Sequence, residues 1–235
     1  MSITERKERE KAERRHAILK AAKEVFFKHG FEHTSMDMIA AESELAKGTL
    51  YLYFKSKEEL YVSLAEEGLE TLDAMTQAAL ASAKTVEEKL LAHTEAYYDF
   101  AQAHPAYMQI FMAIHTGILN DKVEPGRLAQ LQNEKWKRFT QVENLLREGI
   151  KQGIFRRNIN PREMVLMVWS AISGAMMMSS ERCNHTALFE NIDRKQFVMN
   201  IAKVFLHFVK VKSDVTIVSA EKSPKRRAAV AHDEA

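Results

Sequence analysis

The segment from Thr34 to Tyr61 constrains the fold of this 235-residue chain more than any other stretch. Apolar residues recur at helical spacing from Met36 to Ala40, and a three-residue connection, 43–45, follows them. A connection of this length lets a second helix leave at a steep angle to the first. The segment therefore predicts two short helices around a tight turn, at about residues 35–54, with the second helix protruding.

The second helix carries hydrogen-bonding side chains that suit the major groove of DNA. Lys47 can reach a guanine edge or a phosphate, and Thr49 can bond a base edge or touch a thymine methyl group. Tyr51 and Tyr53 have hydroxyls that suit phosphate oxygens, and Gly48 lets the backbone come close. We interpret this stretch as a recognition helix.

A third helix is expected directly afterwards. Ser56 and Glu59 have the spacing of a capping box, so this helix begins at Lys57. Its first amides, together with Lys57, can hold one more phosphate.

Residues 34–61 resemble the TetR/AcrR family of bacterial transcriptional regulators. The resemblance is specific over about residues 14–61 and architectural beyond them. It is carried by Thr34, Ser35, Met36, Ile39, Ala40 and the run 47–60, and by a preceding helix with Ile18, Ala21, Ala22, Val25 and Phe26 on one face, ended by Gly30.

The resemblance implies a role for each matching residue of this segment. Thr34 or Ser35 would touch a phosphate, as would Tyr53 and Lys57. Three further side chains would lie in the groove, namely Lys47, Thr49 and Tyr51.

Two positions depart from the family pattern. Glu44 stands where the family often has Gly in the turn, and a non-Gly residue in a left-handed turn costs roughly 1 kcal/mol. Ala46 stands where the family often has a Ser or Thr cap, and a missing N-cap costs about 1 kcal/mol more. The turn is therefore less well specified than in the family.

Composition predicts an all-α fold. Apolar residues make up 46% of the chain, Gly and Pro are few, and alternating strand patterns are scarce. We expect a three-helix helix-turn-helix DNA-binding domain at 1–56 and a helical effector-binding and dimerisation domain at 57–212. An extension and a disordered tail at 213–235 would follow.

The net charge of +2 conceals an uneven distribution. Residues 1–57 hold twelve Lys and Arg against nine Asp and Glu, so the excess of positive charge lies in the part expected to meet DNA. The excess is modest, and the local pattern is the stronger argument.

Targeting signals are not evident. A charged N-terminus without an apolar core predicts no signal peptide, and the single Cys183 fits a reducing cytoplasm. Residues 164–180 lack charge, but a spanning helix needs about 20 apolar residues. We predict a buried helix there and a cytoplasmic, nucleoid-associated protein.

Both termini leave two interpretations open. Residues 1–16 mix six basic with four acidic residues, which favours a solvated helical extension over a basic arm that contacts DNA. The C-terminal tail contains 225–227, Lys-Arg-Arg, and is more typical of a solvated tail than of an auxiliary DNA contact.

Further helices are predicted from their caps and apolar spacing. We expect them at 57–83, 85–103, 105–118, 128–152, 164–180 and from Asp193 to about 212, with a loop at 120–126.

The last two helices, about 161–183 and 194–212, predict a homodimer. The first is apolar almost all round, so it needs cover on more than one side. In the second, two adjacent apolar stripes form a packing face, Phe197, Ile201, Val204, Phe208 and Val211 beside Val198, Ala202, Phe205 and Val209. Their pairing into a four-helix dimer bundle is what the family resemblance implies.

Aromatic and Met residues on the helices between Thr85 and Gly153, facing others on the buried helix at 164–180, predict a site for a small hydrophobic or aromatic effector. Plain core packing is the alternative for each one. The candidates are Tyr97, Phe100, Tyr107, Phe111, Met112, His115, Trp169 and Met176, with Trp136 and Phe139 beside them.

No cofactor, metal or catalytic site is expected. His93, His104, His115 and His185 do not match zinc spacing, and Cys183 has no visible base beside it. The pattern therefore predicts a sequence-specific DNA-binding regulator, a homodimeric repressor released from a palindromic operator by an effector. The alternative is an architectural DNA-bound protein without an effector, and an enzyme is not expected.

Overall fold

The computed structural model describes residues 3–120, 122–180 and 186–210, and these residues are almost entirely helical. They form nine α-helices and one 3₁₀ turn, with no strand beyond a single bridge between Phe155 and Lys210. The predicted all-α class is correct. The Cys183 and His185 positions and the tail from residue 211 lie outside the described residues.

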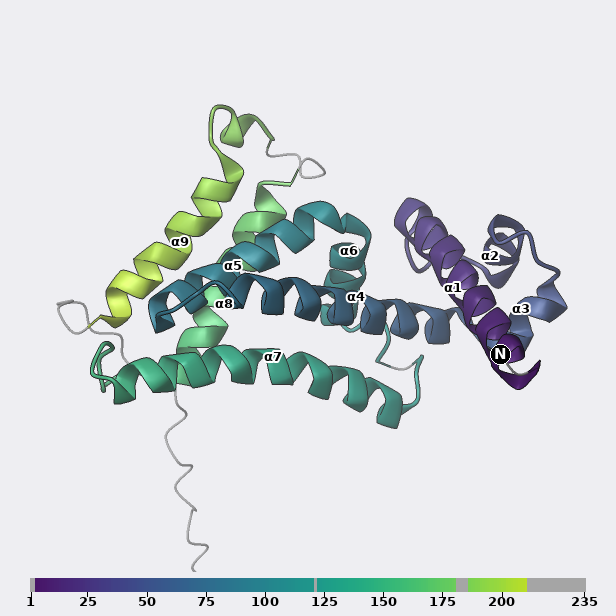
Figure 1. Cartoon of the computed structure of the whole chain (residues 1–235). Helices are drawn as coiled ribbons and strands as arrows, with labels where there is room; N and C mark the ends of the chain where they lie inside the picture. The colour runs from purple at the N-terminus through teal and green to yellow at the C-terminus, as the bar shows by residue number, and fades with distance from the viewer. Residues whose placement is uncertain (1–2, 121, 181–185, 211–235) are drawn as a thin grey trace, which may run out of the picture.

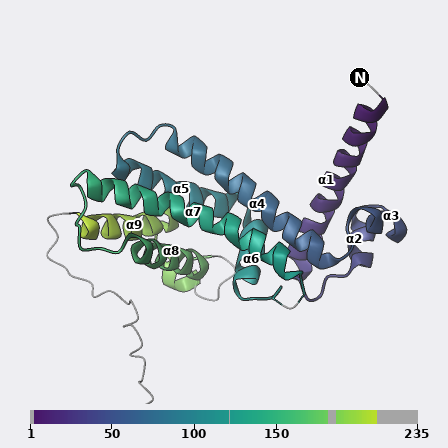
Figure 2. The ribbon, with the colours of Figure 1, turned by 90° about the horizontal axis from the view of Figure 1, so that it is seen from below.

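The first three helices lie together at one end of the molecule (Figure 1). They are α1 (Ile3–His29), α2 (Met36–Glu42) and α3 (Lys47–Tyr53). The N-terminal part of α1, expected as a separate extension, continues the same helix and projects away from the body (Figure 2). Its residues 4–17 are exposed, and Arg6–Glu10 and Arg9–Glu13 form ion pairs along it.

The remaining helices form the larger part of the molecule. They are α4 (Lys57–Leu80), α5 (Val86–Ala103), α6 (Pro105–His115), α7 (Pro125–Lys151), α8 (Pro161–Met178) and α9 (Arg194–Val209), with the 3₁₀ turn η1 (Thr186–Phe189) between the last two. The helix α4 runs from the first three helices into this bundle, and α7 follows it along one side (Figure 1).

Local capping explains most helix starts. Ser56 accepts a hydrogen bond from the Glu59 amide, and Thr85 with Glu88 forms a complete capping box. Both predicted boundaries around the loop expected at 120–126 differ. The helix α6 ends at His115 and not at 118, and α7 begins at Pro125 and not at 128, so the connection is 116–124. Proline is favourable at this first helical position because its missing N–H has no helical partner to lose.

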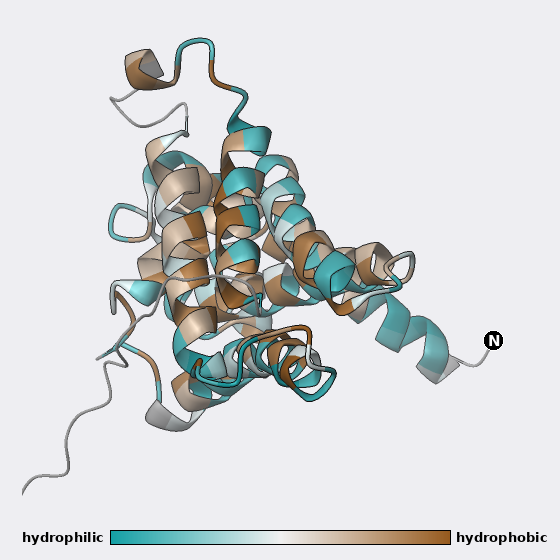
Figure 3. Cartoon of the chain, turned by 90° about the vertical axis from the view of Figure 1, so that its left-hand side faces the viewer, coloured by the Kyte–Doolittle hydropathy of each residue, from teal (hydrophilic) through white to brown (hydrophobic). Residues whose placement is uncertain are grey.

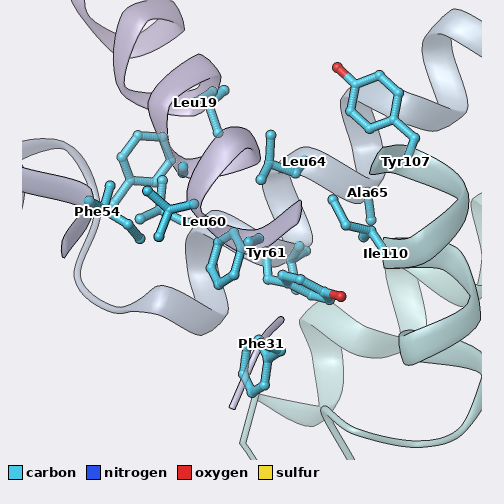
Figure 4. Packing of buried hydrophobic residues seen from close by; sticks show 14 of the residues in the cluster. Leu19, Phe31, Phe54, Leu60, Tyr61, Leu64, Ala65, Tyr107 and Ile110 are labelled. Atoms are coloured by element: carbon cyan, nitrogen blue, oxygen red, sulfur yellow. The ribbon is translucent and has the colours of Figure 1, made fainter. Parts of the chain in front are cut away.

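A continuous hydrophobic core joins the two expected domains. In Figure 4, Leu64 and Ala65 of α4 lie between Leu19 of α1 and Ile110 of α6, and all four belong to one hydrophobic cluster. The rings of Phe31 and Tyr61 meet edge to face at 4.9 Å. The core thus crosses residue 56, and α4 belongs to both halves.

Within the described residues, no helix is both long enough and apolar enough to cross a membrane.

Candidate nucleic-acid interface and ligand cavity

The turn between α2 and α3 has the geometry that its sequence predicts. Glu44 adopts φ +53°, in the left-handed region, and Ala46 makes no side-chain cap to α3. What fixes α3 is its apolar side, since Leu50 and the following Phe54 are fully buried. The outer side of α3 is therefore free to carry polar groups.

The groove-facing candidates lie on this outer side. Lys47 and Gly48 are exposed, Tyr51 is 37% exposed, and Thr49 and Tyr53 are half-buried. Leu52, which the sequence did not single out, is 77% exposed on the same helix. A protruding apolar side chain of this kind is the type that contacts a thymine methyl group.

Lys47 has a partner in the free protein. Its Nζ lies 2.6 Å from Asp37 Oδ1 on α2, and this hydrogen bond raises the pKa of Lys47. Both side chains are solvent-exposed, so the pair can open at little cost when a phosphate or a base edge offers a competing acceptor.

The phosphate candidates Thr34 and Ser35 differ in their surroundings. Thr34 is buried, and its hydroxyl donates to the Gly30 carbonyl at 2.7 Å. Ser35 is exposed and accepts from the Met38 amide as the N-cap of α2, which leaves its own hydrogen to donate. Of the two, only Ser35 is placed to reach a phosphate.

Lys57 is placed differently from the expectation. Its ammonium donates to the Phe31 and Thr34 carbonyls at 2.9 and 3.0 Å, and to Glu32 at 3.3 Å. It also lies 4.6 Å above the Phe31 ring. In the free protein its three hydrogen bonds hold the 30–35 loop, and its contact to a phosphate stays a prediction.

A large cavity lies inside the helical bundle. Its volume is about 580 Å³, within the range of small-molecule sites. The wall is mostly apolar and comes from α4 to α9.

Five of the eight effector candidates line this cavity, namely Tyr97, Phe111, Met112, His115 and Trp169. The other three do not reach it. Phe100, Tyr107 and Met176 are buried in the hydrophobic core, because their sides of α5, α6 and α8 face neighbouring helices. Sequence spacing identified the helices but could not separate wall from core.

The sequence also missed polar members of the wall. His93, Lys135 and Arg138 line the cavity, and nothing in their local spacing marks them. Burial lowers the pKa of both His93 and Lys135. Trp136 and Phe139, mentioned beside the candidates, belong to the wall as well.

The described residues contain no group of three or more His, Cys, Asp or Glu arranged to hold a metal ion.

Comparison with known proteins gives a family match for the DNA-binding end of the chain. Residues 18–64 match the model for bacterial regulatory proteins of the tetR family. The HTH-type transcriptional activator FasR of Mycolicibacterium smegmatis is 36% identical over 90 residues, which are 38% of this chain and 41% of that protein. The match thus spans less than half of that relative's length.

Two longer similarities extend well beyond the DNA-binding end. The fatty acid metabolism regulator protein of Bacillus subtilis is 24% identical over 180 residues, 74% of this chain and 89% of that protein. The structure of the regulator FadR from Bacillus subtilis in complex with stearoyl-CoA superimposes with a TM-score of 0.63 at 18% identity, covering 81% and 97% of the two chains. Both sequence relatives are named as regulators. The helix-turn-helix segment of this chain therefore matches the tetR family of bacterial regulatory proteins, and the chain as a whole shares the helical fold of the FadR structure.

Proposed function

We propose that the protein is a homodimeric repressor that binds a palindromic operator and is released from it by a small hydrophobic effector. The observation that carries this proposal is the joining of a protruding recognition helix, α3, to a cavity-bearing bundle through the single helix α4.

An exposed apolar face on α8 supports the dimer. Leu166, Ser170, Gly174 and Met177 recur at helical spacing, and the large members, Leu166 and Met177, are 37% and 59% exposed. An added Cβ at Gly174 would meet no atom, so a partner helix has room to approach. Figure 3 shows hydrophobic residues (brown) among hydrophilic ones on the helices at this side of the molecule.

On α9, the two apolar stripes differ in exposure, as a dimer requires. Val198, Ala202 and Val209 are buried against their own bundle, whereas Val204 of the other stripe is 67% exposed. We expect Val204→Glu to shift the protein from dimer to monomer in light scattering, while Lys203→Glu on the same helix leaves the mass unchanged. A Val204→Glu protein that stays dimeric would place the interface elsewhere.

A dimer would also explain how a short α3 achieves specificity. Two recognition helices related by a two-fold axis read half-sites about one helical turn or more apart. The same arrangement makes affinity depend on the distance between the two helices.

The cavity supports a sensor over the architectural alternative, since a fully packed bundle would have favoured the latter. A similar structure that holds stearoyl-CoA, and a sequence similarity to a regulator named for fatty acid metabolism, support an elongated apolar effector.

The helix α6 offers a physical link between cavity and DNA-binding domain. Phe111 lines the cavity, and Tyr107, one turn earlier, accepts a hydrogen bond from Lys23 of α1 at 3.1 Å. A ligand that moves α6 would therefore move α1. It shifts the equilibrium only by its differential affinity for the two conformations.

The test begins with selecting bound sequences from a random DNA pool. The Lys47→Ala/Tyr53→Ala double variant should then lose operator affinity by about ten- to a hundredfold or more, because each contact to DNA contributes roughly 1–3 kcal/mol. Lys137→Ala, at an exposed position of α7, serves as the control. Unchanged binding by the folded double variant would overturn the assignment of α3.

Repression itself needs a separate readout. A reporter placed behind the selected operator should be silenced by the protein and restored by an effector. Activation of the reporter would show an activator in place of the proposed repressor. Silencing that no cavity ligand relieves would favour the architectural alternative.

A further inference from the structure

The polar groups of the cavity wall are all neutral or basic. Four basic side chains line it, and no Asp or Glu does so among the described residues. An apolar cavity discriminates between ligands by charge wherever a basic group of its wall has no counter-charge. The basic members are His93, His115, Lys135 and Arg138.

Two of these basic groups, Arg138 and His93, have a carboxylate nearby. Arg138 donates to the Leu69 carbonyl at 3.0 Å and pairs with Asp73 on α4. His93 lies near the same carboxylate, which partly offsets the effect of burial on its pKa. Asp73 therefore balances this side of the cavity.

Lys135 and His115 have no such negative group beside them among the described residues. The Lys135 Nζ lies 3.1 Å from His115 Nδ1, and the described residues place no carboxylate at ion-pair distance from it. Trp169 lies against both groups, with its ring 5.1 Å from His115 and 5.3 Å from the lysine Nζ. One hydrogen of the ammonium is directed to the imidazole, and two remain for a ligand.

The wall changes from polar to apolar along α7. The lining residues of α7 run from Leu131 to Leu146, a length of about 22 Å at the rise of an α-helix. One turn before Lys135 the wall includes the exposed, polar Gln132, and the exposed Asn120 after α6 also lines the cavity.

The other end of the cavity is apolar and buried. Beyond Arg138, the α7 wall consists of Phe139, Val142 and Leu146, and it faces Met164 and Val209. From Lys135 to Leu146 this amounts to about 16 Å. The cavity thus has a charged, accessible end and a long apolar end.

We propose that the effector is a long-chain amphiphile with an anionic head, held with its head between Lys135 and His115 and its chain extending toward Leu146 and Val209. This deepens the proposed function, because it takes the cavity as the effector site. An anion would supply the missing counter-charge of Lys135, and the chain would replace water along the apolar wall.

Other ligand classes fit this wall less well. A cationic amphiphile would place like charges together, and a neutral one would leave the half-buried ammonium without a counter-ion. The shared chemistry of a free fatty acid and of an acyl thioester with a phosphorylated carrier is an anion at the end of an acyl chain, and both meet the requirement.

The chain contains its own probe. Its two tryptophans, Trp136 and Trp169, both line the cavity, so tryptophan fluorescence reports occupancy. Palmitate and palmitoyl-CoA serve as the anionic ligands, at concentrations where they are monomeric, and hexadecanol and hexadecylamine have the same chain with a neutral and a cationic head.

We expect an anionic ligand to bind more tightly than the alcohol and the amine. Lys135→Met should reduce anion affinity about ten- to a hundredfold, the usual effect of losing a charge-assisted hydrogen bond, and should leave hexadecanol unchanged. Lys137→Met, two residues along α7 and exposed, is the matched control and should retain full affinity. Preference for the free acid or for the thioester identifies the source of the anion.

Equal binding of palmitate and hexadecanol, or an unchanged anion affinity in folded Lys135→Met, would falsify the proposal, as would no binding of any of the four probes. Operator release is measured separately on the selected DNA. Lys135-dependent anion binding without operator release would support the ligand class and binding site proposed for the cavity but overturn the role of that ligand as an effector.

Discussion

The Lys57 ammonium lies 4.6 Å above the Phe31 ring while it donates to the Phe31 carbonyl at 2.9 Å. This contact joins the first residue of α4 to the loop that positions α2. It ties the N-terminus of the helix that enters the cavity-bearing bundle to the DNA-binding end.

Lys57→Met should therefore destabilise the folded protein, because the lysine holds the loop in place. Loss of hydrogen bonds from a charged donor to carbonyls should lower the free energy of unfolding by roughly 1–3 kcal/mol in urea titrations. Lys55→Met, which removes a single exposed bond to the Tyr51 carbonyl, is the control. Unchanged stability with weakened operator binding would instead support the phosphate contact of Lys57 that the family resemblance implies.

Glu44→Gly should stabilise the protein. Glu44 has φ +53°, where a side chain costs roughly 1 kcal/mol and glycine costs almost nothing. Thermal unfolding should rise accordingly. Glu42→Gly, in the last turn of α2 at helical φ, should have the opposite effect, and a fall in stability for both variants would show that the Glu44 side chain makes a compensating contribution.

Gly68→Ala should loosen the contact between α4 and α6. An added Cβ would lie 2.9 Å from Cγ of Tyr107 and 3.0 Å from Cζ of Phe111, both atoms of packed rings. Overpacking of this kind costs typically about 1–3 kcal/mol. Gly126→Ala, where a Cβ meets nothing, should be neutral or slightly stabilising in the same unfolding assay. Because Tyr107 contacts Lys23, operator affinity should also change in Gly68→Ala alone.

Stability should fall as pH is lowered below neutrality, in part through His93. Burial lowers its pKa in the folded state from the ordinary value of 6.5, so the unfolded chain binds the proton more readily. The contribution is present above pH 6.5 and is lost as the pH falls below that value. Unfolding measured at about pH 7.5 and about pH 5.5 should differ less in His93→Gln than in the wild type, and equal pH dependence in both proteins would assign the effect to other groups, such as His115.

The sequence by itself determined the helices and the position of the recognition helix α3. Caps at Ser56, Thr85 and Asp193 act within one turn of the chain, so their effects are visible in local spacing. The exposure of Lys47 and the strained turn at Glu44 follow from the same short-range geometry.

Tertiary structure alone decided which side chains face the cavity and which face the core. Tyr107 and Phe111 lie one turn apart on α6, yet only Phe111 reaches the wall, because Lys23 and the rest of α1 cover Tyr107. Lys57 and Lys135 likewise gained their surroundings from residues 20 or more positions away, Phe31 and His115. Long-range contacts set the burial of each side chain and the charges around it. The spacing of apolar residues along a helix does not show which neighbour will cover each face.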